Sequence, residues 1–395
     1  MITITDKSQC SGCSACYSVC PKGAITMQPD EEGFLYPVVD NKCVDCGLCD
    51  KVCPINSSGN DTELPKIAFA IRTKNDKFLK ECASGGFFTQ LSQHILKNNG
   101  VVYGAAYGEN NEVVHTVAEK EAECMKFSSS KYVQSKIGDT FKNVKEDLNS
   151  GRTVCFSGTP CQVEGLLNFL GRDYDNLITV DMVCHGVPSP FLWEKYIESM
   201  EKKYKSKVIN ANFRKKTYGY QSGLLELVFE NGKVYYGSKR NDAMVKSFFT
   251  EISSRMSCYE CAFKKAKHRS DFTMFDCWHA AELVQGLKDD DKGFTNLLVN
   301  TDKGINILTE FAESFEMYEV DIEKAIALDG VMVRKSAKMH PCRTEYYKVI
   351  SENSLKFAIQ KYIPITKKDE IIVSFRSVLY KLGILNTMRK LVKKL

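Results

Sequence analysis

Two short segments of the chain each contain four cysteines at the same spacing. Residues 10–21 read CSGCSACYSVCP and residues 43–54 read CVDCGLCDKVCP, so both follow the pattern C-x-x-C-x-x-C-x-x-x-C-P. Three cysteines at steps of three let one loop surround a metal centre, and the fourth lies one helical turn further on and faces away. The chain has 17 cysteines, an odd number. Metal ligation or redox chemistry therefore explains them better than disulfides do.

The repeated pattern is the bacterial two-cluster ferredoxin signature, in which the fourth cysteine of each segment ligates the other cluster. The spacing predicts one [4Fe–4S] site formed by Cys10, Cys13, Cys16 and Cys53 and another formed by Cys43, Cys46, Cys49 and Cys20. We expect Pro21 and Pro54 to end the short helices. Two zinc sites are the alternative, but zinc sites usually pair their ligands instead of using a triplet and a distant fourth.

Nine further cysteines lie outside this module. Cys258 and Cys261 form a C-x-x-C pair, Cys161 lies at a predicted helix start where a thiolate is stabilised, and Cys184 ends an apolar strand. From spacing alone these four are compatible either with a third cluster or with buried unreactive thiols.

Two loops have the features of a phosphate-binding helix start. In CFSGTPCQ (155–162), Thr159 is a predicted helix cap and Gln162 completes a capping box; in ASGGFF (83–88), Ser84 is the predicted cap. Both loops are equally compatible with ordinary helix starts. The chain contains neither G-x-G-x-x-G nor G-x-x-x-x-G-K-[ST], so a standard dinucleotide fold and a P-loop are not supported.

Strands and helices alternate between residues 66 and 206, which predicts an α/β core. Strands are expected at 66–72, 101–108, 113–118, 153–158 and 177–186, and helices at 84–100, 138–151, 159–171 and 189–204. A hairpin is expected at 223–237, with its turn at Asn231-Gly232.

The length of the chain indicates how many domains it has, and its charge indicates whether it binds nucleic acid. A chain of 395 residues predicts more than one domain, and we divide it into a ferredoxin-like domain (1–60), a larger domain (61–350) and a C-terminal tail (351–395). The net charge is +5, but six basic and no acidic residues follow Glu370, so the rest sums to −1 and does not suggest nucleic-acid binding.

The tail has apolar and basic residues at roughly helical spacing. This pattern predicts a helix on an anionic membrane, a docking helix, or a solvated end. The start of the chain lacks the apolar segment of a secretory signal, and no apolar run is long enough for a spanning helix, so we expect a cytoplasmic protein with possible peripheral membrane contact.

Five ordered segments, CASGGFFT, SSSKYVQS, CFSGTPCQVEGL, VDMVCHGVPSP and CYECAFKKAKHRSDFTMFDCW, resemble the coenzyme F420 hydrogenase/dehydrogenase beta-subunit family. The resemblance runs from about residue 66 to 278 and beyond. It implies an α/β FAD-binding domain with an iron–sulfur cluster beside the flavin, fused here behind the ferredoxin domain. It also implies that Cys161, Cys184, Cys258 and Cys261 ligate a third [4Fe–4S] cluster.

The same resemblance implies that the flavin is contacted by Ser84, Gly85, Gly86, Lys131, Tyr132, Gln134, Ser135, Gly158 and Thr159. Lys131 is a candidate cation for the pyrophosphate or the electron-rich edge of the flavin ring. Relatives tend to read D-I-T-x-G-D-x-W where this chain reads DFTMFDCW. Phe275 replaces the glycine, and we expect its bulk to reshape the wall over the flavin.

These features predict an iron–sulfur flavoprotein oxidoreductase that passes electrons between ferredoxin or reduced coenzyme F420 and a small organic substrate. His185 and His268 are candidate proton donors, with structural hydrogen bonding as the alternative role. The second hypothesis is a non-catalytic electron-transfer subunit of a larger complex. The sequence names neither the substrate, nor the direction of electron flow, nor the oligomeric state.

Overall fold

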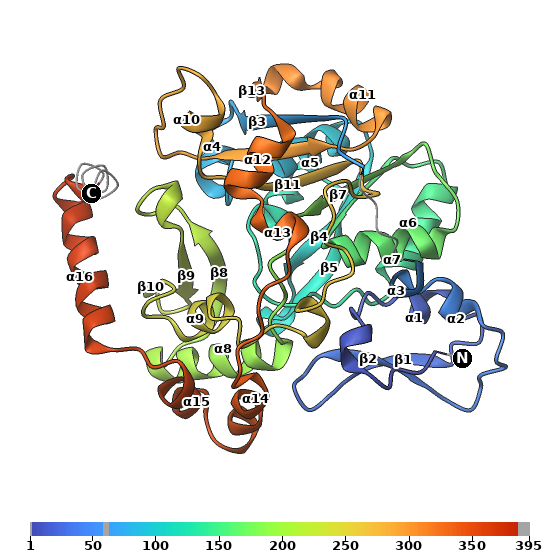
Figure 1. The fold of residues 1–395 in the computed structure, drawn as a ribbon, viewed down its shortest axis with the longest axis horizontal. Helices are drawn as coiled ribbons and strands as arrows, with labels where there is room; N and C mark the ends of the chain where they lie inside the picture. The colour runs from blue at the N-terminus through green and yellow to red at the C-terminus, as the bar shows by residue number, and fades with distance from the viewer. Residues whose placement is uncertain (1, 58–62, 386–395) are drawn as a thin grey trace.

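The computed structural model describes residues 2–57 and 63–385 (Figure 1). The polar stretch 56–65, which predicts a linker after the ferredoxin module, lies outside the described residues at positions 58–62, as does the end of the basic tail at 386–395.

The ferredoxin module is built on one antiparallel hairpin and three short helices. Its elements are α1 (Ala15–Val19), β1 (Ile25–Pro29), β2 (Leu35–Val39), α2 (Leu48–Lys51) and α3 (Pro54–Ser57). Pro21 follows α1 as predicted, whereas Pro54 is the first residue of α3. That position suits proline, because the first residue of a helix has no intrahelical partner for its N–H.

The second part of the chain is built around an eight-stranded mixed sheet in the order β13-β3-β12-β11-β7-β6-β4-β5. The strands are β3 (Ile67–Thr73), β4 (Val101–Tyr107), β5 (Val113–Ala118), β6 (Val154–Gly158), β7 (Leu177–Met182), β11 (Phe272–Cys277), β12 (Phe294–Val299) and β13 (Phe315–Glu319). The four central strands β4, β6, β7 and β11 run parallel to one another, and the remaining pairs are antiparallel. The predicted α/β core is therefore confirmed as a mixed α/β domain.

Helices cover both faces of this sheet (Figure 1). One face packs against α5 (Phe87–Lys97) and α11 (Asp302–Glu310). The other packs against α6 (Thr140–Asn149), α7 (Pro160–Leu170), α10 (Ala280–Leu283) and α12 (Ile322–Asp329). The short α4 (Asp76–Glu81) and α13 (Val331–Arg334) complete this part. Strands β6 and β12 are buried along their whole length because they have helices on both sides.

The start of α5 differs from the prediction. Gly86, with φ of 80°, is the N-cap, and Ser84 lies outside the helix. The hydroxyl of Ser84 lies 2.8 Å from that of Thr295, which also accepts the N–H of Gly85 at 2.9 Å. Ser84 therefore joins the loop to β12 instead of capping the helix.

A smaller three-stranded sheet has the order β10-β9-β8. It consists of β8 (Val208–Lys215), β9 (Leu224–Phe229) and β10 (Val234–Gly237), and the predicted hairpin is confirmed as β9–β10. Its core includes residues of α8 (Pro190–Tyr204), α9 (Ala243–Phe249), α14 (Arg343–Glu352) and α15 (Leu355–Tyr362). Phe34 and Tyr36 of the ferredoxin hairpin belong to the same core, as do Leu355 and Ile359 from the segment predicted as a tail.

The last described helix, α16 (Lys367–Lys381), lies at the outer left edge of the molecule in Figure 1. Its Tyr380 ring is 4.8 Å from that of Tyr218, and Arg376 donates to the hydroxyl of Ser222. Among the described residues, no helix is both long and apolar enough to cross a bilayer.

Candidate functional site

The structure gathers the eight cysteines of the ferredoxin module into two groups of four. One small cavity is lined by Cys10, Cys13, Cys16 and Cys53, and another by Cys20, Cys43, Cys46 and Cys49. We call these the first and the second cysteine site. They are the two sets that the spacing predicts, and their role as cluster ligands stays a prediction.

Backbone N–H groups point at the sulfurs of the second cysteine site. Ile2 donates to Sγ of Cys49 at 3.3 Å, Ala24 to Cys20 at 3.4 Å and Asp45 to Cys43 at 3.4 Å. Gly47 has φ of 73°, a left-handed turn that glycine adopts without strain. Such hydrogen bonds stabilise thiolates and help to set the potential of a bound cluster.

Four cysteines from distant parts of the chain form a third cysteine site: Cys161, Cys184, Cys258 and Cys261. Cys161 lies in the first turn of α7 after β6, and Cys184 follows β7. Burial raises the pKa of these four thiols, and for Cys161, Cys184 and Cys258 the nearness of the other cysteines raises it further. These four partly buried thiols could ligate a metal cluster only after losing their protons, which metal binding would release.

Within residues 2–57 and 63–385, no group of three or more His, Cys, Asp or Glu side chains is close enough to hold a single metal ion.

The first cysteine site lies between the other two: it is near the second site on one side and near the third on the other. Burial is the main cause that raises the pKa of Cys16 in the first site to about 12, and Cys49 of the second site lies near enough to add to the shift. Cys13 of the first site acts in the same way on Cys161 of the third. A Cβ atom at Gly165 of α7 would lie 3.0 Å from Sγ of Cys13, so the glycine lets the ferredoxin module approach this helix closely.

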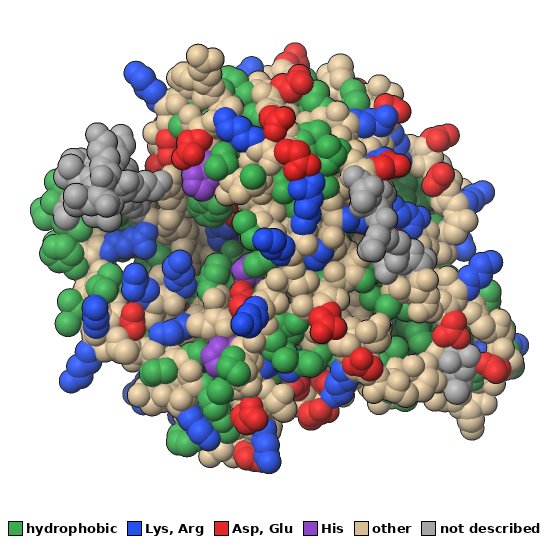
Figure 2. Space-filling view, viewed as in Figure 1, with side chains coloured by type: hydrophobic (Ala, Val, Ile, Leu, Met, Phe, Trp, Pro, Cys, Tyr) green, Lys and Arg blue, Asp and Glu red, His purple; other side chains and the backbone are tan. Residues whose placement is uncertain are grey.

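A cavity of about 400 Å³ opens next to the third cysteine site. It lies at the carboxyl ends of the parallel strands β6, β7 and β11, where ligands bind in many open α/β sheets. Cys184 belongs both to its wall and to the third site. Figure 2 shows the face of the molecule hollowed between its upper and lower left parts, with Lys and Arg side chains around the hollow.

Most of the predicted flavin contacts line this cavity: Ser84, Gly86, Lys131, Tyr132, Ser135, Gly158 and Thr159. The predicted capping box at the start of α7 is confirmed. The backbone N–H of Thr159 donates to Oε1 of Gln162 at 3.0 Å, and Nε2 of Gln162 donates to Ser135 at 3.0 Å. Gln162 thereby joins two of the predicted segments.

Gly85 and Gln134 are not part of the cavity wall. A Cβ at Gly85 would lie 2.2 Å from the carbonyl oxygen of Ile71, so packing against β3 requires this glycine. The amide of Gln134 donates to the carbonyl of Ser11 at 3.0 Å and accepts from Arg255 at 3.1 Å, which places it against the ferredoxin module.

Lys131 and Tyr132 provide a cation and an aromatic ring. Nζ of Lys131 donates to the carbonyl of Lys126 at 2.8 Å, and burial lowers the pKa of Lys131 to about 7. The ring of Tyr132 stacks on Phe248 at 4.5 Å between centroids.

The two histidines proposed as proton donors lie in different surroundings. His185 lines the cavity and pairs through Nε2 with the carboxylate of Glu251. His268 is buried outside the cavity wall, and its Nδ1 lies 2.8 Å from Oδ2 of Asp181. This placement favours His185 for contact with a ligand and a structural role for His268.

Sequence reasoning missed two groups in the cavity wall. His115 is 7% exposed, Nε2 faces the carbonyl of Ser157 at 3.0 Å, and Nδ1 has no partner in the described chain. Burial lowers the pKa of His115 to about 4, so the ring is neutral, and since Nε2 donates to the carbonyl, Nδ1 is a free acceptor. A lone histidine in an alternating strand offers no sequence signal for this.

The second missed group is Arg214 with Asp276. The guanidinium donates to the carboxylate at 2.6 and 3.1 Å and lies 4.9 Å from the ring centroid of Trp278. Asp276 and Trp278 stand in the DFTMFDCW segment, and Phe275 of the same segment also lines the cavity. Arg214 comes from the separate small sheet, so only the tertiary structure brings it here.

The fold and these sites define an iron–sulfur redox protein with a ferredoxin module joined to a mixed α/β domain. Residues 9–57 match the family model of the 4Fe-4S dicluster domain, and residues 151–325 match the family model for the C terminus of the coenzyme F420 hydrogenase/dehydrogenase beta subunit. The chain thus combines an N-terminal 4Fe-4S dicluster domain with a domain that matches the C terminus of the coenzyme F420 hydrogenase/dehydrogenase beta subunit.

Relatives support both parts. Over 80% of its length the chain is 24% identical to a coenzyme F420-dependent sulfite reductase of Methanocaldococcus jannaschii, but it spans only 48% of that protein. An uncharacterized protein of the same organism is 26% identical over 64% of this chain and 80% of its own length. A ferredoxin of Alicyclobacillus acidocaldarius is 32% identical over 18% of this chain and 91% of its own length.

A solved F420-reducing [NiFe] hydrogenase complex of Methanosarcina barkeri contains a chain with 16% identity and a TM-score of 0.45, covering 80% of this chain and 94% of that one.

Proposed function

We propose that this chain is an FAD-containing iron–sulfur oxidoreductase that passes electrons between coenzyme F420 or ferredoxin and a small organic substrate. One observation carries the proposal: Cys184 belongs both to a partly buried group of four cysteines and to the wall of a cavity of ligand-binding size. That cysteine group in turn adjoins the ferredoxin module through Cys13.

The cavity is of ligand-binding size, and the groups in its wall suit the chemistry of FAD. Its volume of about 400 Å³ is within the usual range for ligand pockets, roughly 300–1,000 Å³. Its wall offers an ammonium group at Lys131, a free acceptor at Nδ1 of His115, and the N-terminus of α7 at Thr159, which favours a phosphate. Bound FAD would supply hydride and single-electron chemistry.

The three cysteine sites would each hold one [4Fe–4S] cluster. The first two have the ferredoxin spacing, and the third combines strand ends of the α/β domain with the C-x-x-C pair of Cys258 and Cys261. Cys46 of the second site is exposed, and Cys13 and Cys16 of the first are buried. We therefore assign contact with an external redox partner to the second site.

His185 is the residue that we assign to proton transfer. It lines the cavity, and its pairing with Glu251 orients the ring. Its place in the cavity wall would let the ring exchange a proton with a bound substrate that accepts electrons.

The choice of coenzyme F420 as partner draws on the relatives, one of which is an F420-dependent sulfite reductase. Anaerobic purification followed by iron, sulfide and flavin analysis tests the cofactors, and assays with reduced F420, ferredoxin and viologen-coupled organic acceptors test turnover. We expect FAD and about twelve iron atoms per chain, the content of three [4Fe–4S] clusters. Colourless or zinc-containing protein contradicts the proposal, and cofactors without turnover would point to an electron-transfer subunit.

We also propose that α16 places the protein at an anionic membrane surface. Exposed apolar side chains extend along and beyond this helix: Ile371, Ile372, Phe375, Val378, Tyr380, Leu382 and Ile384. Basic residues without acidic ones follow Glu370 in the sequence. Sedimentation with anionic liposomes at low and high salt, for the full chain and for a chain ending at residue 366, checks this. Equal sedimentation of both contradicts it.

A further inference from the structure

A fully buried arginine lies between the first and the third cysteine site. Arg255 has 0% exposure. Its carbonyl accepts the N–H of Cys258, a member of the third site, at 2.9 Å, and its side chain extends to Cys10 of the first site.

The guanidinium is surrounded by acceptors that carry no formal charge. It donates to the carbonyls of Cys10 at 2.7 Å and Leu35 at 3.0 Å and to the amide oxygen of Gln134 at 3.1 Å. The ring of Tyr36 lies 4.0 Å from its central carbon. The remaining contact is Nη2 to Sγ of Cys10 at 3.5 Å.

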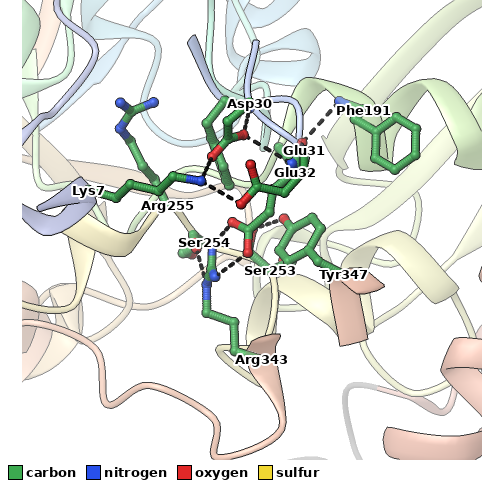
Figure 3. A network of polar contacts seen from close by, with 12 residues as sticks. Lys7, Asp30, Glu31, Glu32, Phe191, Ser253, Ser254, Arg255, Arg343 and Tyr347 are labelled. Atoms are coloured by element: carbon green, nitrogen blue, oxygen red, sulfur yellow. Dashed lines mark hydrogen bonds and ion pairs between the residues drawn. The ribbon is translucent and has the colours of Figure 1, made fainter. Parts of the chain in front are cut away.

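Arg343 provides the contrast within the same region. It is 1% exposed and donates to both oxygens of Glu32, at 2.8 and 2.6 Å. Figure 3 shows this pair with Lys7, Asp30 and Glu31 close by, and no dashed line joins Arg255 to any of the three carboxylates. Within the described residues, Arg255 forms no ion pair with an Asp or Glu side chain.

Buried charges in proteins are normally paired, because an isolated charge loses its hydration without compensation. The group beside Arg255 that can carry negative charge is the thiolate of Cys10. We propose that Arg255 is the internal counter-charge of the first cysteine site and raises the reduction potential of the [4Fe–4S] cluster held there. This inference rests on the proposed function, since it assumes that the first site holds a cluster.

The oxidised and the reduced cluster differ in charge, and this difference is the physical basis of the inference. Reduction adds one electron from the external reductant and no proton, so the cluster and its four thiolates gain one negative charge. A fixed positive charge in a buried, weakly screening environment stabilises the reduced state more than the oxidised one. Removing the charge should therefore make the cluster harder to reduce.

The test is a redox titration of the purified, anaerobic full-length protein followed by electron paramagnetic resonance. For Arg255→Gln we expect at least a tenfold fall in the equilibrium constant for reducing one cluster, equivalent to a potential about 59 mV lower. Lys7→Gln is the control, because Lys7 is also a cation near the first site but is half-exposed and already paired with Asp30 and Glu31. In Lys7→Gln we expect the equilibrium constant for reducing each cluster to change less than threefold.

Gln134→Glu covers the case in which Arg255→Gln does not retain iron. This change keeps the side-chain length and places a carboxylate 3.1 Å from the guanidinium, at the expense of the amide donor to Ser11, so it compensates the positive charge without removing the arginine. The equilibrium constant for reducing the same cluster should again fall at least tenfold. The inference is wrong if Arg255→Gln retains iron and the equilibrium constant for reducing each cluster stays within threefold of its wild-type value. If Arg255→Gln loses iron, the same result in Gln134→Glu contradicts the inference. Wild-type protein without iron would instead overturn the proposed function.

Discussion

Two residues of the candidate site, Cys184 and Lys131, can carry charge but lie in surroundings that disfavour the charged form. Cys184 is partly buried, lies with three other cysteines in the third site, and at the same time forms part of the cavity wall. Lys131 faces the same cavity with a pKa lowered to about 7 by burial. Both groups are therefore held in states that a bound metal or an anionic ligand would change.

Replacing Cys184 with serine should remove one ligand from the third site only. We expect a loss of about four iron atoms per chain, the content of one [4Fe–4S] cluster. Cys342→Ser is the matched control, since Cys342 lies in none of the three sites, and its iron content should equal that of wild type. Iron analysis and resonance spectra of both variants measure this. Full iron content in Cys184→Ser would exclude it as a ligand.

Lys131 should take up a proton when an anionic ligand binds. At pH 8 a group with pKa of about 7 is mostly neutral, and a nearby phosphate raises its pKa. Calorimetric titration with FAD in two buffers of different ionisation enthalpy should report uptake of about one proton per chain, and Lys131→Met should abolish it. Identical uptake in the variant would show that another group titrates.

The same shift sets the sign of a stability effect. The folded pKa of Lys131 lies below the unfolded value of about 10.4, so the unfolded state binds more protons between pH 7 and pH 10.4. Lys131 therefore makes unfolding less favourable as pH rises through this interval. In Lys131→Met, denaturant titrations of the ligand-free protein should show a smaller rise in stability over the same range.

At the scale of elements, helix α7 connects the cavity and the third cysteine site to the first cysteine site of the ferredoxin module. Its N-cap Thr159 lies at the cavity, Cys161 of the third site lies in its first turn, and further along the helix Gly165 faces Cys13 of the first site. A glycine inside a helix usually lowers stability by about 1 kcal/mol relative to alanine, so its presence here reflects the close approach of α1.

Enlarging Gly165 should separate the first and third sites. Gly165→Leu introduces a side chain where even a Cβ lies 3.0 Å from Cys13, and we expect loss of iron or weaker magnetic coupling between clusters. Gly165→Ala is the graded comparison, because a shift of a few tenths of an ångström accommodates one methyl group. Spectra of Gly165→Leu that match those of wild type would mean that the two parts do not pack as described.

At the scale of the whole molecule, the ferredoxin module contacts a segment from the last part of the chain. The turn between β1 and β2 presents Glu32 to Arg343 of α14, 311 residues later (Figure 3). Phe34 of the same hairpin packs into the core shared by α8, α9, α14 and α15. The ferredoxin module is thus attached through α7 at one place and through this ion pair at another.

Breaking the pair should loosen the module. Glu32→Gln leaves Arg343 buried without a counter-charge, and we expect a stability loss of about 3–5 kcal/mol, followed as the loss of cluster absorbance in denaturant. The double change Glu32→Leu with Arg343→Met replaces the pair by apolar groups of similar size and should recover most of that loss. A loss under about 1 kcal/mol in Glu32→Gln would show that the pair does not hold the module.

The sequence by itself determined the features that depend on local spacing. The ferredoxin signature, the hairpin at Asn231-Gly232 and the capping box of Thr159 and Gln162 each depend on residues close together in the chain. Family resemblance extended this to the four cysteines of the third site, which the fold brings together.

Only the tertiary structure decided which of these residues share a site. It placed Gln134 against the ferredoxin module, His268 outside the cavity, and Arg214 and Arg255 next to partners from distant segments. Contacts across a mixed sheet and between two modules join residues tens to hundreds of positions apart. Local periodicity and capping contain no information about such contacts, because they depend on which faces the packed core brings together.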